Sequence, residues 1–165
     1  MTAALPIAVS CGEPAGIGPE IAVQAWDTLR DRCPFFWIGD PRHLPHGTDF
    51  TEISSPSEAL TVCSSSLPVL ALSFRSPSNL GSPKAEHAVA VIQSIESAVS
   101  LVQTWQASAL CTAPIQKKAL IEGADFAYPD YTESLAARAA KSHGGMKQAQ
   151  KHVVEAWRAK EKGRG

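Results

Sequence analysis

The sequence predicts an α/β fold with a largely parallel sheet. Short apolar runs typical of strands alternate with segments whose apolar residues recur at helical spacing. Strands that alternate with helices imply crossover connections, and these join parallel strands. In such a sheet the ligand contacts lie at the carboxyl ends of the strands, so the residues that follow each predicted strand are the first candidates for a site.

The chain opens with a strand, a loop and a helix. Pro6–Ser10 is a short apolar run, and a turn-rich loop follows it. Pro19 suits the first turn of the next helix, because a proline there lacks only an N–H that the helix leaves unpaired. Pro34 ends this helix. Its apolar residues recur at helical spacing as Ile21, Ala22, Ala25 and Leu29.

Two further strands and an unpatterned stretch follow. The aromatic run Phe35–Ile38 is bounded by Gly39 and predicts a second strand. Residues 41–66 are mixed in composition and are predicted to be loop. Pro68–Leu72 predicts a third strand. The first half of the chain thus contributes three strands and one helix.

The second half contains the strongest helical pattern of the chain. Ser82 and Pro83 are predicted to be the N-cap and the first residue of a helix that reaches about Trp105. Its apolar face steps by four, three, four and three residues through Ala88, Ile92, Ile95, Val99 and Val102.

A fourth strand and two more helices complete the pattern. Ala109–Thr112 predicts a short buried strand, in which Cys111 is expected to be a small buried hydrophobe. A helix is predicted to follow over Pro114–Ile121, with Gly123 ending it. Another helix is predicted over Thr132–Ser142.

Composition limits the class of protein. The chain has 165 residues, of which 44% are hydrophobic and 19% charged, and this excludes collagen-like, coiled-coil and disordered proteins. No apolar run approaches the roughly 18 residues of a membrane span, and Met1–Val9 lacks the basic start of a secretory signal. We therefore expect a soluble, cytoplasmic protein without membrane contacts.

The four cysteines point to reduced thiols. Cys11, Cys33, Cys63 and Cys111 form no Cys-x-x-Cys pair, which argues against a zinc knuckle, a thioredoxin-type motif or a dense disulfide framework. Cys11 adjoins a glycine-rich loop, and an unreactive thiol is the favoured interpretation there as well.

The last twenty residues differ from the rest in charge. Residues 146–165 carry six basic side chains against Glu155 and Glu161, while the whole chain has a net charge of −1. This predicts a boundary near Gly144–Gly145, between residues 1–145 and a basic, helix-prone tail. Such a tail can contact nucleic acid or an acidic surface, but six charges without aromatic interleaving are generic, so nucleic acid is not an expected partner. A terminus that is not native to the rest of the chain, produced by truncation or a shifted reading frame, is the favoured interpretation.

The loop after the first predicted strand is a candidate anion-binding site. Gly12, Gly16 and Gly18 permit positive φ angles and close backbone approach, and the start of the next helix exposes unpaired N–H groups. A phosphate or carboxylate suits such a loop. The spacing Gly-x-x-x-Gly-x-Gly is neither the dinucleotide fingerprint nor a P-loop. A tight structural turn and a binding loop are therefore equal alternatives.

Polar residues gather after the fourth predicted strand and at the start of the last predicted helix. They lie in residues 112–120 and 128–136, where α/β proteins place ligand contacts. Thr132 can cap its helix with its hydroxyl, and ligand binding by that hydroxyl is the alternative role.

Three segments together resemble one family. Gly12–Glu20 reads Gly-Glu-Pro-Ala-Gly-Ile-Gly-Pro-Glu, residues 112–120 read Thr-Ala-Pro-Ile-Gln-Lys-Lys-Ala-Leu, and Thr132-Glu133 precedes Leu135-Ala136. In this order and spacing they resemble 4-hydroxythreonine-4-phosphate dehydrogenase, over about Pro6 to Gly145. Residues 81–86 are similar to a degraded form of the family's Gly-Lys-Pro-Ser-Ala-Glu segment.

The resemblance implies a fold and an activity. It implies two domains with an isocitrate/isopropylmalate dehydrogenase-like fold, of which residues 1–145 would form most of one lobe and the start of the second, and a homodimer with the active site in the cleft. It implies NAD-dependent oxidation of 4-phosphooxy-L-threonine, a phosphorylated hydroxy amino acid, with decarboxylation to 3-amino-2-oxopropyl phosphate in the biosynthesis of pyridoxine and pyridoxal phosphate. A divalent metal such as zinc, magnesium or cobalt would polarise the substrate oxygens.

The sequence departs from the family pattern at two places. The family's Gly-His-Thr-Glu is Asp130-Tyr131-Thr132-Glu133 here, so the resemblance implies substrate binding by Thr132 and places Tyr131 where the family has a histidine. A phenol donates a hydrogen bond but does not carry a proton near neutral pH. The family's three metal-binding histidines and most of its dinucleotide contacts lie beyond the segment that matches Gly144–Gly145, so no metal ligand and no catalytic residue is expected in this chain.

The five histidines suggest no replacement metal site. His43 and His46 are three residues apart, and His87, His143 and His152 are isolated in the sequence. Surface or loop positions are therefore expected for them. We expect no dehydrogenase turnover from this chain alone, and the alternative function is a non-catalytic binding or interaction module that pairs with a complementary polypeptide.

Overall fold

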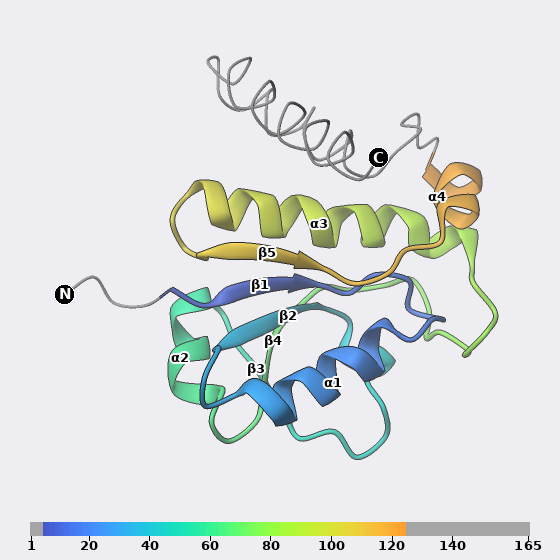
Figure 1. Cartoon of the computed structure of the whole chain (residues 1–165). Coiled ribbons are helices and arrows are strands. Elements are labelled where there is room, and N and C mark those ends of the chain that lie inside the picture. Colours follow the sequence, from blue (N-terminus) through green and yellow to red (C-terminus); the bar gives the residue numbers. More distant parts are fainter. Residues whose placement is uncertain (1–4, 125–165) are drawn as a thin grey trace, which may run out of the picture. The chain divides into compact units, whose positions relative to one another are not determined.

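The computed structural model describes residues 5–124, which form one parallel sheet with helices on both faces (Figure 1). The sheet has five strands in the order β3-β4-β2-β1-β5, and every neighbouring pair is parallel. The predicted α/β fold is confirmed. The strands are β1 (Ile7–Ser10), β2 (Phe35–Gly39), β3 (Phe50–Glu52), β4 (Leu67–Ala71) and β5 (Ala109–Thr112). The helices are α1 (Gly18–Leu29), α2 (Ala59–Val62), α3 (Ala88–Gln103) and α4 (Lys117–Ala124), with the 3-10 helices η1 (Pro41–His43), η2 (Pro56–Glu58) and η3 (Ala85–His87).

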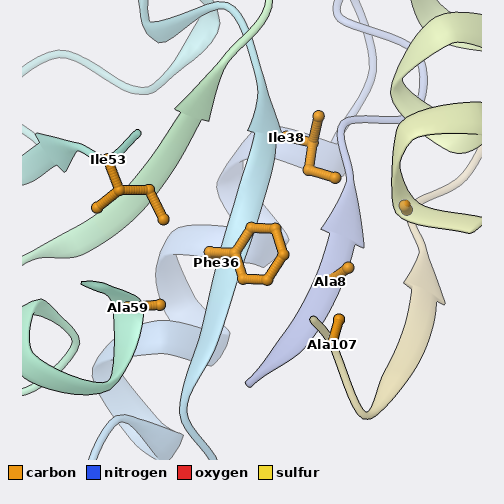
Figure 2. Packing of buried hydrophobic residues seen from close by; sticks show 7 residues of the cluster. Ala8, Phe36, Ile38, Ile53, Ala59 and Ala107 are labelled. Atoms are coloured by element: carbon orange, nitrogen blue, oxygen red, sulfur yellow. The ribbon is translucent and has the colours of Figure 1, made fainter. Parts of the chain in front are cut away.

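The core lies around the central strands. All five residues of β2 are buried, because β2 lies inside the sheet and α3 and α2 pack against it. Phe36 and Ile38 of β2 belong to one cluster with Ala8 of β1, and Figure 2 shows how these side chains lie. The other buried members of the cluster are Ile53, Ala59, Ala98 and Ala107. Small and large side chains thus interdigitate, and burial of the Phe36 side chain contributes about 2 kcal/mol.

Helix α3 begins later than predicted, and its buried face overlaps the predicted one only in part: Ala88 and Ile95 are buried as expected. Pro83 is not its first residue, since η3 intervenes between Pro83 and α3. Ile92, Val99 and Val102, predicted to face the core, are only half-buried. The buried face is shifted toward smaller residues, because α3 packs across β1, β2 and β5. The buried residues of α3 are Ala88, Ala90, Val91, Ser94, Ile95 and Ala98.

Strand β5 has its predicted bounds but lies at an exposed edge of the sheet. Within residues 5–124 it pairs with β1 alone, and Cys111 is exposed. Helix α3 packs against β5, whereas an apolar hollow of about 200 Å³ opens between β5, β1 and α1. The prediction that Cys111 is buried was therefore wrong, because no described element covers the second face of this strand.

Two further local predictions were wrong. Residues 41–66, predicted to be loop, contain β3 and α2; β3 has three residues, all exposed at the other edge of the sheet, and so has no alternating pattern. Gly123 does not end its helix but lies inside α4. The Ala85 carbonyl comes so close to Gly123 that any Cβ there would clash, so the glycine permits α4 to approach η3.

Some predictions concern residues outside the described range. By its internal contacts the chain divides into Met1–Phe126 and Ala127–Gly165, and the described residues all belong to the first unit. The helix predicted over Thr132–Ser142 and the boundary near Gly144–Gly145 lie outside residues 5–124 and stay predictions. Within the described residues, no helix has the length and apolar character needed to span a bilayer.

Candidate ligand site at the carboxyl edge of the sheet

The glycine-rich loop lies where the order of the strands changes direction. From β1 the chain proceeds to β2 on one side, and β5 later adds to the other side of β1. In open parallel sheets, ligands bind at the carboxyl ends of the strands at such a switch point. The loop after β1 and the segment after β5 therefore form the first candidate site.

The glycines of this loop allow its backbone to pack closely against neighbouring backbone atoms. Gly12 has φ +68°, and a Cβ on it would lie 2.5 Å from the Pro114 carbonyl oxygen. A Cβ on Gly18 would lie 2.8 Å from the Cys11 carbonyl oxygen, and one on Gly16 would lie 3.3 Å from the Glu13 carbonyl oxygen. Only Gly12 of the three uses a positive φ angle. The loop is a tight turn against the end of β5, and anion binding by its glycines stays a prediction.

Glu13 is the charged residue of the loop. It is 7% exposed, and its Oε1 accepts a hydrogen bond of 3.0 Å from the Ala15 N–H. The Glu13 N–H donates to the Pro114 carbonyl at 2.8 Å, and the Gly16 N–H donates to the Glu13 carbonyl at 3.0 Å. Three backbone N–H groups of the loop are thus already bonded inside the chain. The N–H groups that remain as donors for a bound anion are those in the first turn of α1.

A cavity of about 290 Å³ adjoins this loop. Its size is at the lower end for small-molecule pockets, so it suits one part of a ligand. The Gly81 N–H donates to the Ala15 carbonyl at 2.8 Å, which ties the connection between β4 and η3 to the glycine loop. The cavity is lined by Glu13, Ala15, Gly16, Ile17, Pro83, Pro114, Ile115 and Gln116.

Ser94 of α3 supports the site from the buried side. Its hydroxyl accepts a hydrogen bond of 3.1 Å from the Cys11 N–H and donates one of 2.7 Å to the Ile38 carbonyl. The hydroxyl thereby joins the end of β1 to the end of β2. Burial raises the pKa of the Cys11 thiol to about 12, so the favoured interpretation of Cys11 as unreactive agrees with the structure. Ser94 was missed, because the predicted apolar face of α3 excluded it.

Asp40 fixes the backbone that follows β2. Its carboxylate accepts two hydrogen bonds from the Arg42 side chain to Oδ2, of 2.6 and 3.1 Å, and one of 3.0 Å from the Phe74 N–H. Burial alone would raise the pKa of Asp40, but the hydrogen bonds from Arg42 and the backbone outweigh burial and lower it to about 2. Asp40 thus binds the segment after β2 to the segment after β4.

Two histidines distant in sequence come together at the same edge. His43 is 8% exposed and His87 is 1% exposed, and their ring centroids lie 5.6 Å apart. Their Nε2 atoms lie 3.3 and 3.1 Å from the Ser76 carbonyl oxygen. The prediction of surface or loop positions was wrong for both, because sequence spacing does not show that the end of β2 and the start of α3 meet. His43 follows a predicted strand by five residues, and that was the one available signal.

The described residues do not form the metal site that the resemblance implies. Within residues 5–124, no group of three or more His, Cys, Asp or Glu side chains could hold a metal ion. Asp40 is engaged by Arg42, and both described histidines of the pair face a carbonyl. Tyr131 and Thr132, the predicted substrate-binding residues, lie outside the described residues.

The fold and the loop define the class of protein, and comparison with known proteins defines the family. A parallel α/β sheet with a glycine-rich loop after its first strand places the chain among α/β proteins that present loops at the strand carboxyl ends. The chain belongs to the family of the pyridoxal phosphate biosynthetic protein PdxA, whose model matches residues 31–156. The match passes the predicted boundary at Gly144–Gly145, and the origin of residues 146–165 stays a prediction.

Individual relatives support the same assignment. The 4-hydroxythreonine-4-phosphate dehydrogenases of Ruegeria sp. (strain TM1040) and Roseobacter denitrificans (strain ATCC 33942 / OCh 114) are 58% and 55% identical to it over 137 residues. Each match covers 83% of this chain and 42% of the relative, so the chain spans less than half the length of these relatives.

Solved structures agree with the fold. A 4-hydroxythreonine-4-phosphate dehydrogenase from Burkholderia phymatum matches with TM-score 0.71 and 30% identity over 82% of this chain and 44% of that chain. The enzyme of the same name from Klebsiella pneumoniae matches with TM-score 0.70 and 26% identity over 84% of this chain and 45% of that chain. The predicted resemblance and the partial isocitrate/isopropylmalate dehydrogenase-like fold are both confirmed.

Proposed function

We propose that this chain forms the N-terminal part of an NAD- and divalent-metal-dependent dehydrogenase that oxidises 4-phosphooxy-L-threonine in pyridoxal phosphate biosynthesis. The observation that carries the proposal is the family match, combined with the position of the cavity of about 290 Å³ at the switch between β1 and β5. Residues on both sides of this cavity, in the loop after β1 and the segment after β5, belong to the motifs that resemble the family.

The remaining parts of the proposal follow from the family. Thr132 and Tyr131 bind the substrate, with Tyr131 donating a hydrogen bond from the position of the family's histidine. The metal ion, which is zinc, magnesium or cobalt, is bound by family residues that have no counterpart among residues 5–124 of this chain. The enzyme is cytoplasmic and homodimeric, and the decarboxylated product is 3-amino-2-oxopropyl phosphate.

A chimeric enzyme tests the proposal directly. Residues 1–145 replace the matching segment of the Ruegeria relative, and NADH formation from 4-phosphooxy-L-threonine is followed by absorbance. We expect activity, and we expect Tyr131→His to raise kcat/KM by about 10² by restoring a proton carrier. Thr132→Ala, which removes the hydroxyl proposed to bind the substrate, serves as the matched variant. A folded, dimeric chimera that produces no NADH, with or without Tyr131→His, contradicts the proposal.

The 165-residue chain alone is expected to be inactive. It spans 42% of the Ruegeria relative, and the described residues contain no group of three metal-ligating side chains. Incubation of the purified chain with substrate, NAD and each of the three metals should give no NADH above the control without protein. NADH formation above that control contradicts this expectation.

A second candidate function is favoured by the exposed edge of the sheet. Strand β5 has an unpaired edge within the described residues, next to an apolar hollow of about 200 Å³ whose lining includes Ile21, Ala25 and Cys111. An unpaired strand edge beside an apolar hollow is suited to add a strand from another chain. We infer a non-catalytic module that pairs through this edge with a complementary polypeptide, namely the portion of the family protein that this chain does not span.

Co-expression tests this second candidate. The tagged chain is expressed with the remaining portion of the Ruegeria relative, and the two should purify together in equal amounts. Ile21→Asp, in the hollow and 45% exposed, should abolish the pairing, whereas Leu60→Asp on α2, 40% exposed and outside the hollow, should not. Equal recovery of the partner with both variants refutes pairing at this surface.

A further inference from the structure

The wall of the candidate cavity depends on one short connection. Pro83 lines the cavity, and Gly81 is bonded to the glycine loop through its N–H. Both belong to residues 72–84, which join β4 to η3. The same connection carries Ser76, whose carbonyl oxygen faces both His43 and His87. The contacts that fix Ser76 therefore position the cavity wall.

The hydrogen bonds assign the tautomers of the two rings. A backbone carbonyl only accepts hydrogen bonds, so each Nε2 that bonds to the Ser76 carbonyl must carry a proton. One carbonyl oxygen has two lone pairs and can accept from both rings. The Ser76 hydroxyl donates to Glu86, accepts from the Lys84 ammonium at 3.0 Å, and also lies 3.2 Å from His87 Nε2, so it shares the N–H of that ring with the carbonyl. Each ring thus carries a proton on Nε2 that points to the Ser76 carbonyl.

The other nitrogen of each ring, Nδ1, has no acceptor among residues 5–124 to which a proton on it could bond. The Nδ1 atoms of His43 and His87 are buried and lack a hydrogen-bond partner within the described residues. A proton added to the neutral His43 ring goes to Nδ1, where it meets no acceptor. Burial lowers the pKa of His43 below its ordinary value of 6.5. The Ser76 carbonyl and Asp40 act against this lowering, whereas repulsion from Arg42, and from His87 when that ring is protonated, adds to it.

The charged groups around the two histidines already have ionic or hydrogen-bonding partners. On the η1 side, Asp40 is bonded to Arg42 and to the Phe74 N–H. On the η3 side, the Glu86 carboxylate lies 4.0 Å from His87 Nε2 and 3.8 Å from the Lys84 ammonium. The Phe74 ring packs edge-on against both imidazoles, with centroid distances of 4.8 and 5.5 Å. The pair is therefore enclosed by an aromatic ring and by two ion pairs.

We propose that His43 and His87 form an acid-sensitive clasp that regulates the candidate cavity. The two rings bind the Ser76 carbonyl through Nε2–H and keep residues 72–84 against the glycine loop, and an added proton on His43 releases this wall. Release exposes the His43 ring to water, where Nδ1–H finds an acceptor. The inference concerns regulation of the cavity named in the proposed function. Its test requires no ligand, so its failure and the failure of the proposed function are distinguishable.

The direction of the pH effect follows from proton linkage. His43 binds a proton more readily in the open form than in the closed form, so acid favours opening. The closed form is fully stable above pH 6.5, the ordinary pKa of histidine, and loses stability as the pH falls below this value. The opening constant should rise by up to about tenfold per pH unit until the pKa of the closed form is reached.

Amide hydrogen exchange on the 165-residue chain measures this opening. The Gly81 N–H reports the wall, and the Ile53 N–H, bonded to the Val69 carbonyl at 2.9 Å, serves as an internal reference. Between pH 6.5 and 5.5, Gly81 protection, corrected for the intrinsic exchange rate, should fall by up to about fivefold relative to Ile53, because the open form is already half-protonated at pH 6.5. NMR titration of the His43 ring should give a pKa below 6.5.

Variants separate the clasp from a general effect of acid. In His43→Gln the amide can still donate to Ser76 but does not titrate, so Gly81 protection should no longer depend on pH. His46→Gln, which removes a histidine outside the pair, should behave as wild type. The same pH dependence in His43→Gln as in wild type overturns the proposal. A ring pKa for His43 at or above 6.5 overturns it even if His43→Gln does not fold.

Discussion

Replacing Gly12 by alanine tests the packing of the glycine loop against β5. Gly12 has φ +68°, and this conformation costs an L-residue about 1–2 kcal/mol. The new Cβ would also lie 2.5 Å from the Pro114 carbonyl oxygen and 2.8 Å from the Ala113 Cβ, and relief of such overpacking costs a further 1–3 kcal/mol, approximately. The free energy of unfolding should therefore fall by about 2–5 kcal/mol.

Gly47→Ala is the matched control. Gly47 has φ +82°, but nothing lies within 4 Å of a Cβ built there, so only the conformational cost of about 1–2 kcal/mol applies. Urea unfolding followed by tryptophan fluorescence gives both free energies. With a slope of about 2 kcal/mol per molar urea, a loss of about 3 kcal/mol lowers the midpoint by about 1.5 M. Equal losses for the two variants would refute the close approach of Gly12 to Pro114.

Three further predictions concern single side chains. Ser94→Ala should destabilise the fold by about 1–3 kcal/mol in urea unfolding, because it leaves two buried backbone groups without a partner, while Ser97→Ala on the same helix should have little effect. Cys111 should react with a thiol reagent in the native protein at pH 8, whereas Cys11, buried and with its pKa raised to about 12, should react only after unfolding; similar rates would contradict the burial described. The lowered pKa of Asp40 adds about 2 kcal/mol of stability above about pH 4 that is lost as the pH falls through 2, so the difference in unfolding free energy between wild type and Asp40→Asn should shrink over this range.

Strands with continuous apolar runs were predictable from the sequence. Phe35–Ile38 and Ala109–Thr112 were recognised because apolar runs bounded by turn residues are typical of strands in parallel sheets. β3 was not, since its three residues are all exposed and show no apolar alternation. A pattern of side chains cannot indicate a strand whose side chains all face solvent.

Burial was harder to predict than secondary structure. The apolar character of the β5 run indicated a buried strand, but exposure of Cys111 depends on which elements cover the sheet. The face of α3 was misjudged for a related reason: the largest side chains were assumed to face the core, whereas the close approach of α3 to the sheet favours Ala98 and Ser94 there.

The candidate site was predictable only in part. The glycine loop was located because glycines and prolines that follow an apolar run are typical of a turn after a strand. The meeting of His43 with His87 depends on the order of strands in the sheet, which local patterns do not encode. Tyr131 and Thr132 were located by resemblance, and their roles stay predictions.

The hydroxyl of Ser94 sets the longitudinal position of α3 on the sheet. A slide of the helix by one turn, about 5.4 Å, would bring Ala90 or Ala98 to the place of Ser94. Neither alanine has a side-chain group that can bond to the Cys11 N–H or the Ile38 carbonyl. In each shifted arrangement both buried backbone groups would therefore lack a hydrogen-bond partner. The two hydrogen bonds of this one hydroxyl therefore disfavour a shift of α3 by one turn in either direction along the sheet.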